Sequence, residues 1–450
     1  MRSITWLLVY HWFFLCLVRN KRLILVWIVW LGIASPALAE TQVINPSGAR
    51  VIPESYFGMH VRWGATTPFW PSARFHTWRV ITAETTWYGL EPRKGIWRFA
   101  SLDKAVARAQ ANGIEVMLTL GQTPPWASAR PLEKVPNGWG ASAEPKDIAD
   151  WENYIRTVAT RYKGKIKYYE LWNEPRFREV DPYRAVAGFT GTAKQMVNMG
   201  IIAKRVLNEI DPEAKLISPA ADAGLPGLKR VKAWLDAGGG EISNVIAYHI
   251  YVTPPEEIPK VVRALRNLVN QYGLNGVEIW NTESGFLIED PDRKAEVTGS
   301  EVFGEVLSVE MGAAYLARSL ILGAASGLDR NFWYSWDIPS MALTEGKGRV
   351  ITAAGNAYIT TERWLRGATI SECRTADDKL WICSLNRADR KAYLVWNTSG
   401  VRDWRPPTLW QAKRYETLQG REANADVSGR IQLDESPVLI VADDMAWGTP

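Results

Sequence analysis

The chain has 450 residues, enough for one large domain and a smaller one, and its 47% apolar and 22% charged content is ordinary for a soluble globular protein. Four units of its formal charge of +5 come from residues 1–39, which hold four basic residues and no acidic one and so leave 49 of the 53 basic residues against 48 acidic ones. This nearly neutral body argues against electrostatic capture of nucleic acid or of an anionic membrane surface.

Residues 1–39 predict a targeting segment rather than part of the fold. Arg19-Asn20-Lys21-Arg22 precedes an apolar run at 23–33, and Ala37-Leu38-Ala39 has the small-x-small pattern of signal-peptidase cleavage. A second apolar run at 4–18 leaves two alternatives, a cleaved signal peptide, which we favour, or an anchor in the inner membrane. Both runs are shorter than the roughly 20 residues of a spanning helix. We expect export to the periplasm or the medium, with or without anchoring.

From residue 56 to residue 365, strand-like and helix-like runs alternate. Helical spacing of apolar residues, as at 148–162, predicts amphipathic helices between the strands. The expected strands are 57–61, 75–80, 114–120, 166–172, 215–219, 245–251, 277–282 and 331–336. Eight such units predict a parallel (β/α)8 TIM barrel of the α/β class.

Residues 366–450 show a different pattern, typical of a small antiparallel β-sandwich. Short alternating strands are expected at 381–385, 392–396, 431–433 and 438–441, and a short β segment at 40–55 is expected to join this domain. Cys373 and Cys383 flank a turn-like cluster, which places their thiols opposite one another across a hairpin. We predict a structural disulfide, with two free buried thiols as the alternative.

Two glutamates end apolar, β-rich runs, in Trp172-Asn173-Glu174-Pro175 and in Trp280-Asn281-Thr282-Glu283-Ser284-Gly285. They lie 109 residues apart (174 to 283), which fits three strand–helix units of roughly 30 residues each and assigns them to the fourth and seventh strands. In such barrels the active site lies where the carboxyl ends of the strands converge. Each run alone could be an ordinary turn, but together they predict the facing carboxylates that glycoside hydrolysis requires.

The surroundings of the two glutamates predict different roles. Partial burial of Glu174 against aromatic surface would keep its carboxyl protonated near neutrality, as a general acid/base requires. Glu283 is the candidate nucleophile and needs nearby donors, which Arg79 and Tyr251 are placed to provide. Asn173 is expected to hydrogen-bond a sugar hydroxyl next to the reacting carbon. The alternatives are a salt bridge unrelated to catalysis for Arg79 and a turn-forming role for Asn173.

Histidines and tryptophans supply the remaining candidates for substrate binding. The four histidines lack the short spacing of metal ligands, so we predict no metal and no cofactor. His60, and His249 with Tyr251 two residues further along the sixth strand, are expected to contact substrate, although a satisfied core histidine fits His249 equally well. Tryptophans at strand ends are expected to stack on the apolar faces of sugars, with core packing as the alternative for each one. The three that we select are Trp126, Trp280 and Trp336.

These motifs resemble the retaining glycoside hydrolases built on eight-stranded barrels, and more narrowly glycoside hydrolase family 39. The resemblance covers most of residues 56–340. It is carried by the two glutamate runs, His249 with Tyr251, Trp336, and an early stretch that runs from Leu90-Glu91-Pro92 through Gly95, Trp97 and Phe99 to Leu102-Asp103. It implies Glu174 as acid/base, Glu283 as nucleophile, retention of anomeric configuration and an accessory β-sandwich. We interpret Glu91 as structural, because it precedes a proline turn.

Within that family the exported layout is most similar to bacterial endoglycosidases associated with exopolysaccharide and biofilm. The leading hypothesis is a monomeric, endo-acting retaining enzyme whose partner is a polysaccharide or oligosaccharide substrate and not a nucleic acid. The alternatives are an exo-acting, xylosidase-like β-glycosidase of the same fold and a polysaccharide-binding protein without catalysis.

Overall fold

The computed structural model describes residues 43–44, 49–181, 188–289, 305–338, 341–375, 379–412, 414–441 and 447. The predicted leader at 1–39 lies outside these residues. Within them, no helix is both long enough and apolar enough to cross a membrane.

A closed parallel barrel forms the larger part of the described chain, as predicted. Its eight strands follow one another around the barrel in chain order, and the last pairs with the first. They are β2 (Phe57–Met59), β3 (Thr77–Val80), β4 (Glu115–Thr119), β7 (Tyr168–Glu170), β8 (Lys215–Ile217), β9 (Val245–His249), β10 (Glu278–Ser284) and β11 (Arg330–Trp333). All eight predicted strands are present, mostly with shorter bounds, because several predicted runs continue into buried loops that make no strand pairing.

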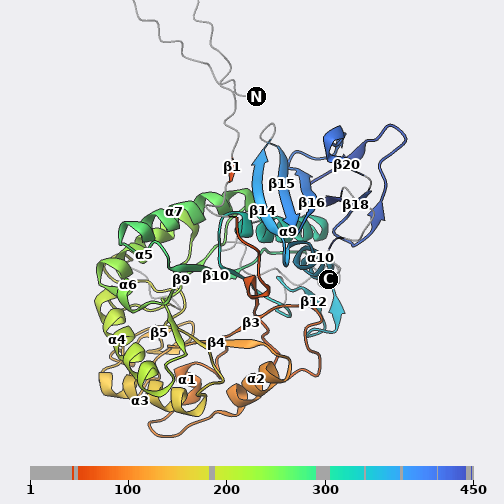
Figure 1. The fold of residues 1–450 in the computed structure, drawn as a ribbon. Helices are drawn as coiled ribbons and strands as arrows, with labels where there is room; N and C mark the ends of the chain where they lie inside the picture. The colour runs from red at the N-terminus through yellow and green to blue at the C-terminus, as the bar shows by residue number, and fades with distance from the viewer. Residues whose placement is uncertain are drawn as a thin grey trace, which may run out of the picture. The chain divides into compact units, whose positions relative to one another are not determined.

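Helices surround the barrel strands (Figure 1). Each strand from β3 to β11 is followed by at least one of the longer helices, and Thr192 begins α4 with a capping box in which Gln195 returns the hydrogen bond. The helices are α1 (Trp87–Leu90), α2 (Ala100–Ala111), α3 (Ile148–Arg161), α4 (Ala193–Ile210), α5 (Gly224–Asp236), α6 (Gly239–Ile242), α7 (Ile258–Gln271), α9 (Val309–Ala325) and α10 (Ala353–Leu365), with 3-10 turns η1 (Glu54–Tyr56), η2 (Pro255–Glu257) and η3 (Thr408–Trp410).

Antiparallel sheets follow the barrel, as the sequence predicted. The larger sheet has the order β1 (Val43–Ile44), β14 (Thr369–Thr375), β15 (Leu380–Arg387), β16 (Arg390–Asn397), β21 (Val438–Val441), β18 (Arg414–Glu416) and β19 (Glu422–Ala423). A ribbon of β17 (Arg402–Trp404) and β20 (Ile431–Leu433) contributes to one apolar core with this sheet, around Ile382, Trp410 and Leu433. Strand β1 pairs with β14, so the segment before the barrel joins the C-terminal sheet.

The C-terminal sheet is fastened to the barrel in one compact unit. Arg387 donates to the carbonyls of Arg363, Trp364 and Arg366 at the end of α10. Within the sheet, Cys373 on β14 lies opposite Cys383 on β15, and the two are joined in a disulfide with a Cα–Cα distance of 4.0 Å.

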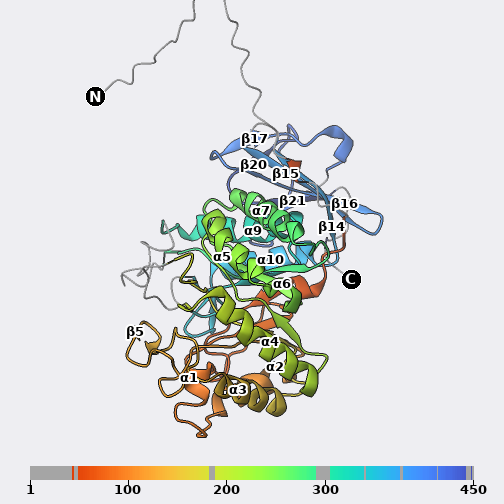
Figure 2. The ribbon, with the colours of Figure 1, turned by 90° about the vertical axis from the view of Figure 1, so that its left-hand side faces the viewer.

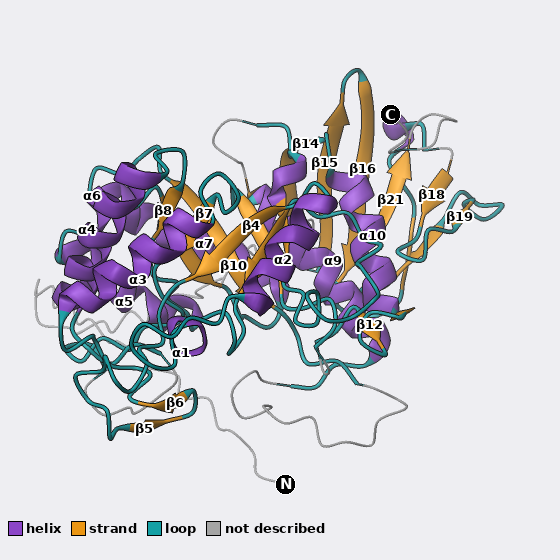
Figure 3. Ribbon diagram, turned by 90° about the horizontal axis from the view of Figure 1, so that it is seen from below, coloured by secondary structure: helices purple, strands orange, loops and turns teal. Residues whose placement is uncertain are grey.

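Two short hairpins extend from loops that follow barrel strands. Strands β5 (Lys134–Val135) and β6 (Gly138–Trp139) pair in the loop after β4, and the hairpin stands beside α1 (Figures 2 and 3). Strands β12 (Thr344–Glu345) and β13 (Val350–Ile351) pair in the loop after β11. Both hairpins therefore belong to the carboxyl ends of the strands, the face where a parallel barrel places its active site.

Candidate active site

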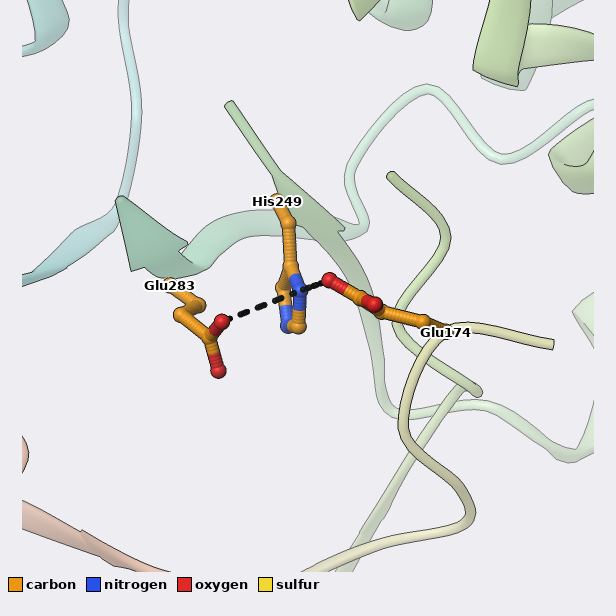
Figure 4. Close-up of side chains that lie close together, drawn as sticks. All are labelled: Glu174, His249 and Glu283. Atoms are coloured by element: carbon orange, nitrogen blue, oxygen red, sulfur yellow. Dashed lines mark hydrogen bonds and ion pairs between the residues drawn. The ribbon is translucent and has the colours of Figure 1, made fainter. Parts of the chain in front are cut away.

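The two predicted glutamates face one another at the carboxyl end of the barrel (Figure 4). Glu174 follows β7, and its backbone amide donates to the carbonyl of Ala220 at 2.9 Å, which ties this turn to the chain after β8. Glu283 lies near the end of β10. One oxygen of each carboxylate lies within 4.8 Å of the other. Their side chains are 28% and 12% exposed, so both are largely buried but remain accessible.

Glu174 has a left-handed backbone conformation, with φ at 46°. For a residue with a side chain this conformation costs roughly 1–2 kcal/mol, and it persists only where the surroundings impose it. Here Arg176 supports the turn by donating to the carbonyl of Glu174 at 3.1 Å and by binding both carboxylate oxygens of Asp222. The strained turn therefore directs the Glu174 carboxylate toward Glu283.

Arg79 organises the side of the site around Glu283. Its guanidinium is fully buried and donates to Glu283 Oε2 at 2.7 Å, to Asn173 Oδ1 at 2.8 Å and to Glu170 Oε2 at 2.8 Å. Burial lowers the pKa of Arg79, but the charges of Glu170 and Glu283 more than offset it and raise the pKa above its ordinary value. Arg79 therefore stays charged, and because it can only donate, it leaves the amide nitrogen of Asn173 as the group that can meet a ligand.

Tyr251 holds the other oxygen of Glu283. Its hydroxyl donates to Oε1 at 2.8 Å, and burial followed by the charge of Glu283 raises the pKa of Tyr251 well above 10.0. The phenol is thus a permanent donor. With Arg79 on one oxygen and Tyr251 on the other, the carboxylate of Glu283 is fixed in orientation and held in an ion pair.

His249 is hydrogen-bonded to Glu174, with 2.9 Å between Nδ1 and Oε1, and its Nδ1 lies 3.9 Å from Glu283 Oε1 (Figure 4). Burial lowers the pKa of His249, but the charge of Glu283 and the bond to Glu174 raise it above 6.5. Burial raises the pKa of Glu174, but the bond and charge of His249, with Arg176 and Arg79, bring it below 4.5. The pair therefore shares one proton, which rests on the imidazole. The expectation that burial alone keeps Glu174 protonated is wrong, because it left out this partner.

Comparisons with known proteins relate part of this site to glycoside hydrolases. Residues 71–218 match the model of glycosyl hydrolase family 10. The matched range contains Glu174 and ends before Glu283. The chain is 30% identical over 125 residues to a 6-phospho-beta-glucosidase from Clostridium longisporum and 28% identical over 130 residues to endo-1,4-beta-xylanase C from Phanerodontia chrysosporium. These alignments cover 25% and 29% of this chain, which spans only 25% and 30% of the length of those two proteins.

Solved structures share the fold over nearly the whole chain. A family 30 subfamily 8 xylanase from Clostridium acetobutylicum has a TM-score of 0.59 at 15% identity, covering 89% of this chain and 99% of that one. A monomeric beta-xylosidase from Caulobacter crescentus CB15 gives 0.59 at 15%, covering 88% and 97%, and a family 39 enzyme from Xanthomonas axonopodis pv. citri gives 0.57 at 14%, covering 87% and 95%. At these identities the likeness shows the fold alone. The comparisons do not select family 39, so that narrower prediction is not confirmed.

Three of the predicted substrate-binding residues are buried and contribute to the packing that supports the site. Trp280 is 1% exposed and packs inside the barrel, where Arg330 lies 4.3 Å from its ring. Trp336 is also 1% exposed, because the β12–β13 hairpin covers it at Gly348. His60 is bonded to the carbonyl of Thr282 at 2.9 Å, and burial with the charge of Arg79 holds its pKa well below 6.5. None of the three offers a face to a sugar.

Trp126 is half-buried in the loop after β4 and donates its indole N–H to the carbonyl of Glu91 at 2.8 Å. Glu91 itself is buried and accepts from Trp87 Nε1 and from the amide of Gly95, which fits the structural role we assigned to it. The exposed part of Trp126 is approached by Lys94, whose Nζ lies 5.6 Å from the ring. Trp126 is thus on the correct face of the barrel, and no direct contact joins it to the carboxylate pair within the described residues.

On the side of the site around Glu283, the sequence analysis missed Glu170 and Tyr334. Glu170 is fully buried on β7 and shares Arg79 with Glu283, and Thr119 donates to it at 2.8 Å. Its signal was an acidic residue in the middle of the predicted strand 166–172. Tyr334 follows β11, and burial together with the charge of Glu283 raises its pKa to about 12. No sequence signal distinguishes it from the other aromatic residues.

Glu174, His249 and Glu283 also form the group whose ligand atoms lie close enough together to hold a metal ion, all within 4.8 Å. The contacts of these atoms argue against a cation in this place. Arg79 already donates to Glu283 at 2.7 Å, and a second positive charge beside the guanidinium would be repelled. His249 Nδ1 and Glu174 Oε1 are hydrogen-bonded to each other at 2.9 Å, so a metal ion would have to displace this bond.

We expect Arg79→Gln to destabilise the protein strongly, because it leaves Glu170 buried without its cation. Removing one partner of a buried ion pair costs about 3–5 kcal/mol. Urea denaturation at pH 7 measures the loss in the free energy of unfolding. The matched control adds Glu170→Gln to the first change, which removes the unpaired charge and should recover part of the stability. A loss of under about 1 kcal/mol, typical of an exposed pair, would contradict this account.

Proposed function

We propose that this chain is a retaining glycoside hydrolase. The observation that carries the proposal is the separation of the carboxylates, with one oxygen of each within 4.8 Å of the other. Retaining enzymes hold their carboxyl groups about 5–5.5 Å apart so that one can reach the anomeric carbon, whereas inverting enzymes need about 6.5–9.5 Å to admit a water. The short separation therefore supports double displacement through a glycosyl-enzyme.

The contacts of each carboxylate support the assignment of roles. Glu283 is paired with the cation of Arg79 and is oriented by Arg79 and Tyr251, as a nucleophile must be. Glu174 is bonded to His249, which carries a proton that can pass to Glu174 Oε1 when the glycosidic oxygen needs it. In the second half of the reaction Glu174 accepts a proton from water, and the water releases the sugar from Glu283. The Asn173 amide is placed beside Arg79 to bind the neighbouring hydroxyl.

We further propose endo action on a bacterial extracellular polysaccharide, as in the family 39 enzymes that the sequence resembles. The loop after β4 supports a site that extends beyond one sugar. Its β5–β6 hairpin stands beside α1 (Figure 3) and carries Trp139, which is 50% exposed, with Gly138 against the ring of Tyr88. An exposed aromatic side chain on the same face of the barrel as the two carboxylates suits stacking of a more distant sugar.

Export and a monomeric state are part of the same proposal. The charged and apolar pattern of residues 1–39 supports export, whether the segment is cleaved or anchors the protein in the inner membrane. The disulfide between Cys373 and Cys383 also supports it, because such bonds persist in oxidising compartments.

The deciding experiment incubates the protein with a panel of exopolysaccharides and plant β-glycans and sizes the products. Mixed oligosaccharides appearing early indicate endo action, and single sugars released from one end indicate exo action. Proton NMR of the first products should show the configuration of the starting bond. First products of inverted configuration would refute the mechanism. If both the unaltered protein and Glu283→Gln bind a polymer alike and neither cleaves it, the chain is a binding protein.

We expect His249→Gln to shift the basic limb of the pH dependence of kcat/KM to lower pH. This limb reports the group that must be protonated in the free enzyme. In the unaltered protein the shared proton leaves at the raised pKa of His249, above 6.5. Without the imidazole, Glu174 must hold the proton alone, and it binds the proton less tightly than His249 does, because Arg176 and Arg79 still oppose the effect of burial on its pKa. The control His76→Gln, at the opposite end of the barrel, should leave the limb in place, and an unmoved limb in His249→Gln would contradict the shared proton.

A further inference from the structure

We propose that Arg62 and Lys347 form a binding subsite for an acidic sugar residue, beside the nucleophile on the rim of the barrel above β11 and β2. The inference rests on the proposed function and adds the charge of the substrate to it. The ligand chemistry is a pyranose that bears a carboxylate or a sulfate ester.

Two exposed cations lie against one half-buried ring in this place. The guanidinium carbon of Arg62 lies 5.6 Å from the centre of the Trp63 ring, and Nζ of Lys347 lies 4.9 Å from it. The negative face of an aromatic ring attracts a cation placed over it. Trp63 therefore acts as the support that holds the two cations near one another, and its ring is occupied by them rather than free to stack on a sugar.

Hydrogen bonds hold the backbone at Arg62 and at Lys347, so the positions of the two cations do not depend on a bound ligand. Asp337 is buried and accepts from the backbone amides of Arg62 and Trp63 at 2.8 and 2.9 Å. Thr67 donates to the carbonyl of Lys347 at 3.1 Å, which ties the tip of the β12–β13 hairpin to the loop after β2. A site whose donors are positioned in advance loses less entropy when it binds.

Neither cation forms a salt bridge with a carboxylate of the described chain, although the charge of Asp337 acts on Arg62 from a longer distance. Within the described residues, no salt bridge joins Arg62 or Lys347 to an acid, whereas Arg79 and Arg176, the other two arginines around the carboxylate pair, are both paired. The two oxygens of Asp337 are directed at backbone amides rather than at the guanidinium. Two cations against the same ring, neither in a salt bridge with a described residue, are suited to binding an anion. The guanidinium of Arg62 can donate two parallel hydrogen bonds to it, and the ammonium of Lys347 supplies a compact charge.

The subsite adjoins the carboxylate pair. Glu283 lies on β10, Tyr334 follows β11 and Arg62 follows β2, and these three strands are neighbours in the barrel. Tyr334 lies within electrostatic reach of both the nucleophile and the subsite. Burial and the charge of Glu283 raise its pKa, while the charge of Arg62 lowers it. A sugar chain that places one ring at Glu283 can thus bring a neighbouring acidic ring to Arg62 and Lys347.

The test measures binding to matched pairs of polymers by affinity gel electrophoresis, with Glu283→Gln to prevent turnover. The pairs are hyaluronan, alginate and glucuronoxylan, each with its carboxyl-reduced form, and dextran sulfate with dextran. We expect at least one acidic polymer to bind tenfold or more tightly than its neutral form, with an affinity that falls as salt rises. The arm that shows the preference distinguishes carboxylates from sulfate esters.

The decisive variant carries Arg62→Gln and Lys347→Gln in addition to Glu283→Gln, and it should lose the preference for acidic over neutral polymers. Its matched control is Lys163→Gln with Arg263→Gln, which removes one exposed cation of each kind elsewhere. The proposal is overturned if no acidic polymer is preferred, or if the preference survives in the Arg62 and Lys347 variant. Hydrolysis by the protein with Glu283 intact is scored separately. Cleavage of neutral polymers without any preference for acidic ones would support the proposed hydrolase and refute the subsite. Binding of acidic polymers through these cations without any cleavage would support the subsite and refute the hydrolase.

Discussion

Glu283→Gly is expected to lower kcat by about 10⁴-fold or more on an aryl β-glycoside of the sugar that the polysaccharide panel identifies. The nucleophile is then absent, and enzymes that act through a covalent intermediate lose most of their rate when it is removed. The cavity left by the side chain lies between Arg79 and Tyr251, two donors that would hold an anion. Added azide should therefore restore turnover and give a glycosyl azide of inverted configuration.

The control for this variant is Glu278→Gln, on the same strand but at its amino-terminal end, where the side chain accepts from Trp280 Nε1 at 2.7 Å. It removes a carboxylate from β10 without touching Glu283, and activity should persist. Azide product with the configuration of the substrate, or a Glu283→Gly protein with normal activity, would remove Glu283 from the role of nucleophile. Circular dichroism of both variants confirms that the fold is intact.

The sequence predicted the parts of the fold that are encoded locally. Each barrel strand is a short apolar run bounded by a turn, so its place is visible without knowledge of its partners. The two glutamates were found for the same reason, since each stands where such a run ends. Arg79 and Tyr251 also followed from their positions near strand ends, and the structure brings both to Glu283.

What could not be predicted depends on residues distant in the chain. Trp336 stands at a strand end like the glutamates, yet the hairpin around Gly348 covers it. Trp280 lies inside the barrel because its side chain points into the interior, where its ring meets that of Tyr168 from β7. The proton of Glu174 is set by His249, 75 residues away. Burial can be guessed from local sequence, but the partner that reverses its effect on a pKa cannot.

Glu174→Ala is expected to have an effect that depends on the leaving group. A natural polysaccharide needs its departing oxygen protonated, so its hydrolysis should fall by about 10²–10⁴-fold, the usual contribution of general acid–base catalysis. A dinitrophenyl glycoside leaves without a proton, and its attack by Glu283 should stay fast. The second step still lacks a base, so the glycosyl-enzyme should accumulate and appear as a burst of dinitrophenol followed by slow turnover.

The same variant tests which carboxylate is the acid/base. Azide needs no base and should accelerate the slow phase of Glu174→Ala, giving a glycosyl azide of retained configuration, the opposite of the product expected from Glu283→Gly. Intact mass spectrometry during the slow phase should show one added sugar, and a peptide map should locate it on Glu283. A uniform loss across all leaving groups, with no burst and no azide effect, would show that Glu174 only positions the substrate. In that case the proton on His249, bonded to Glu174 at 2.9 Å, would have no route to the glycosidic oxygen through this carboxylate.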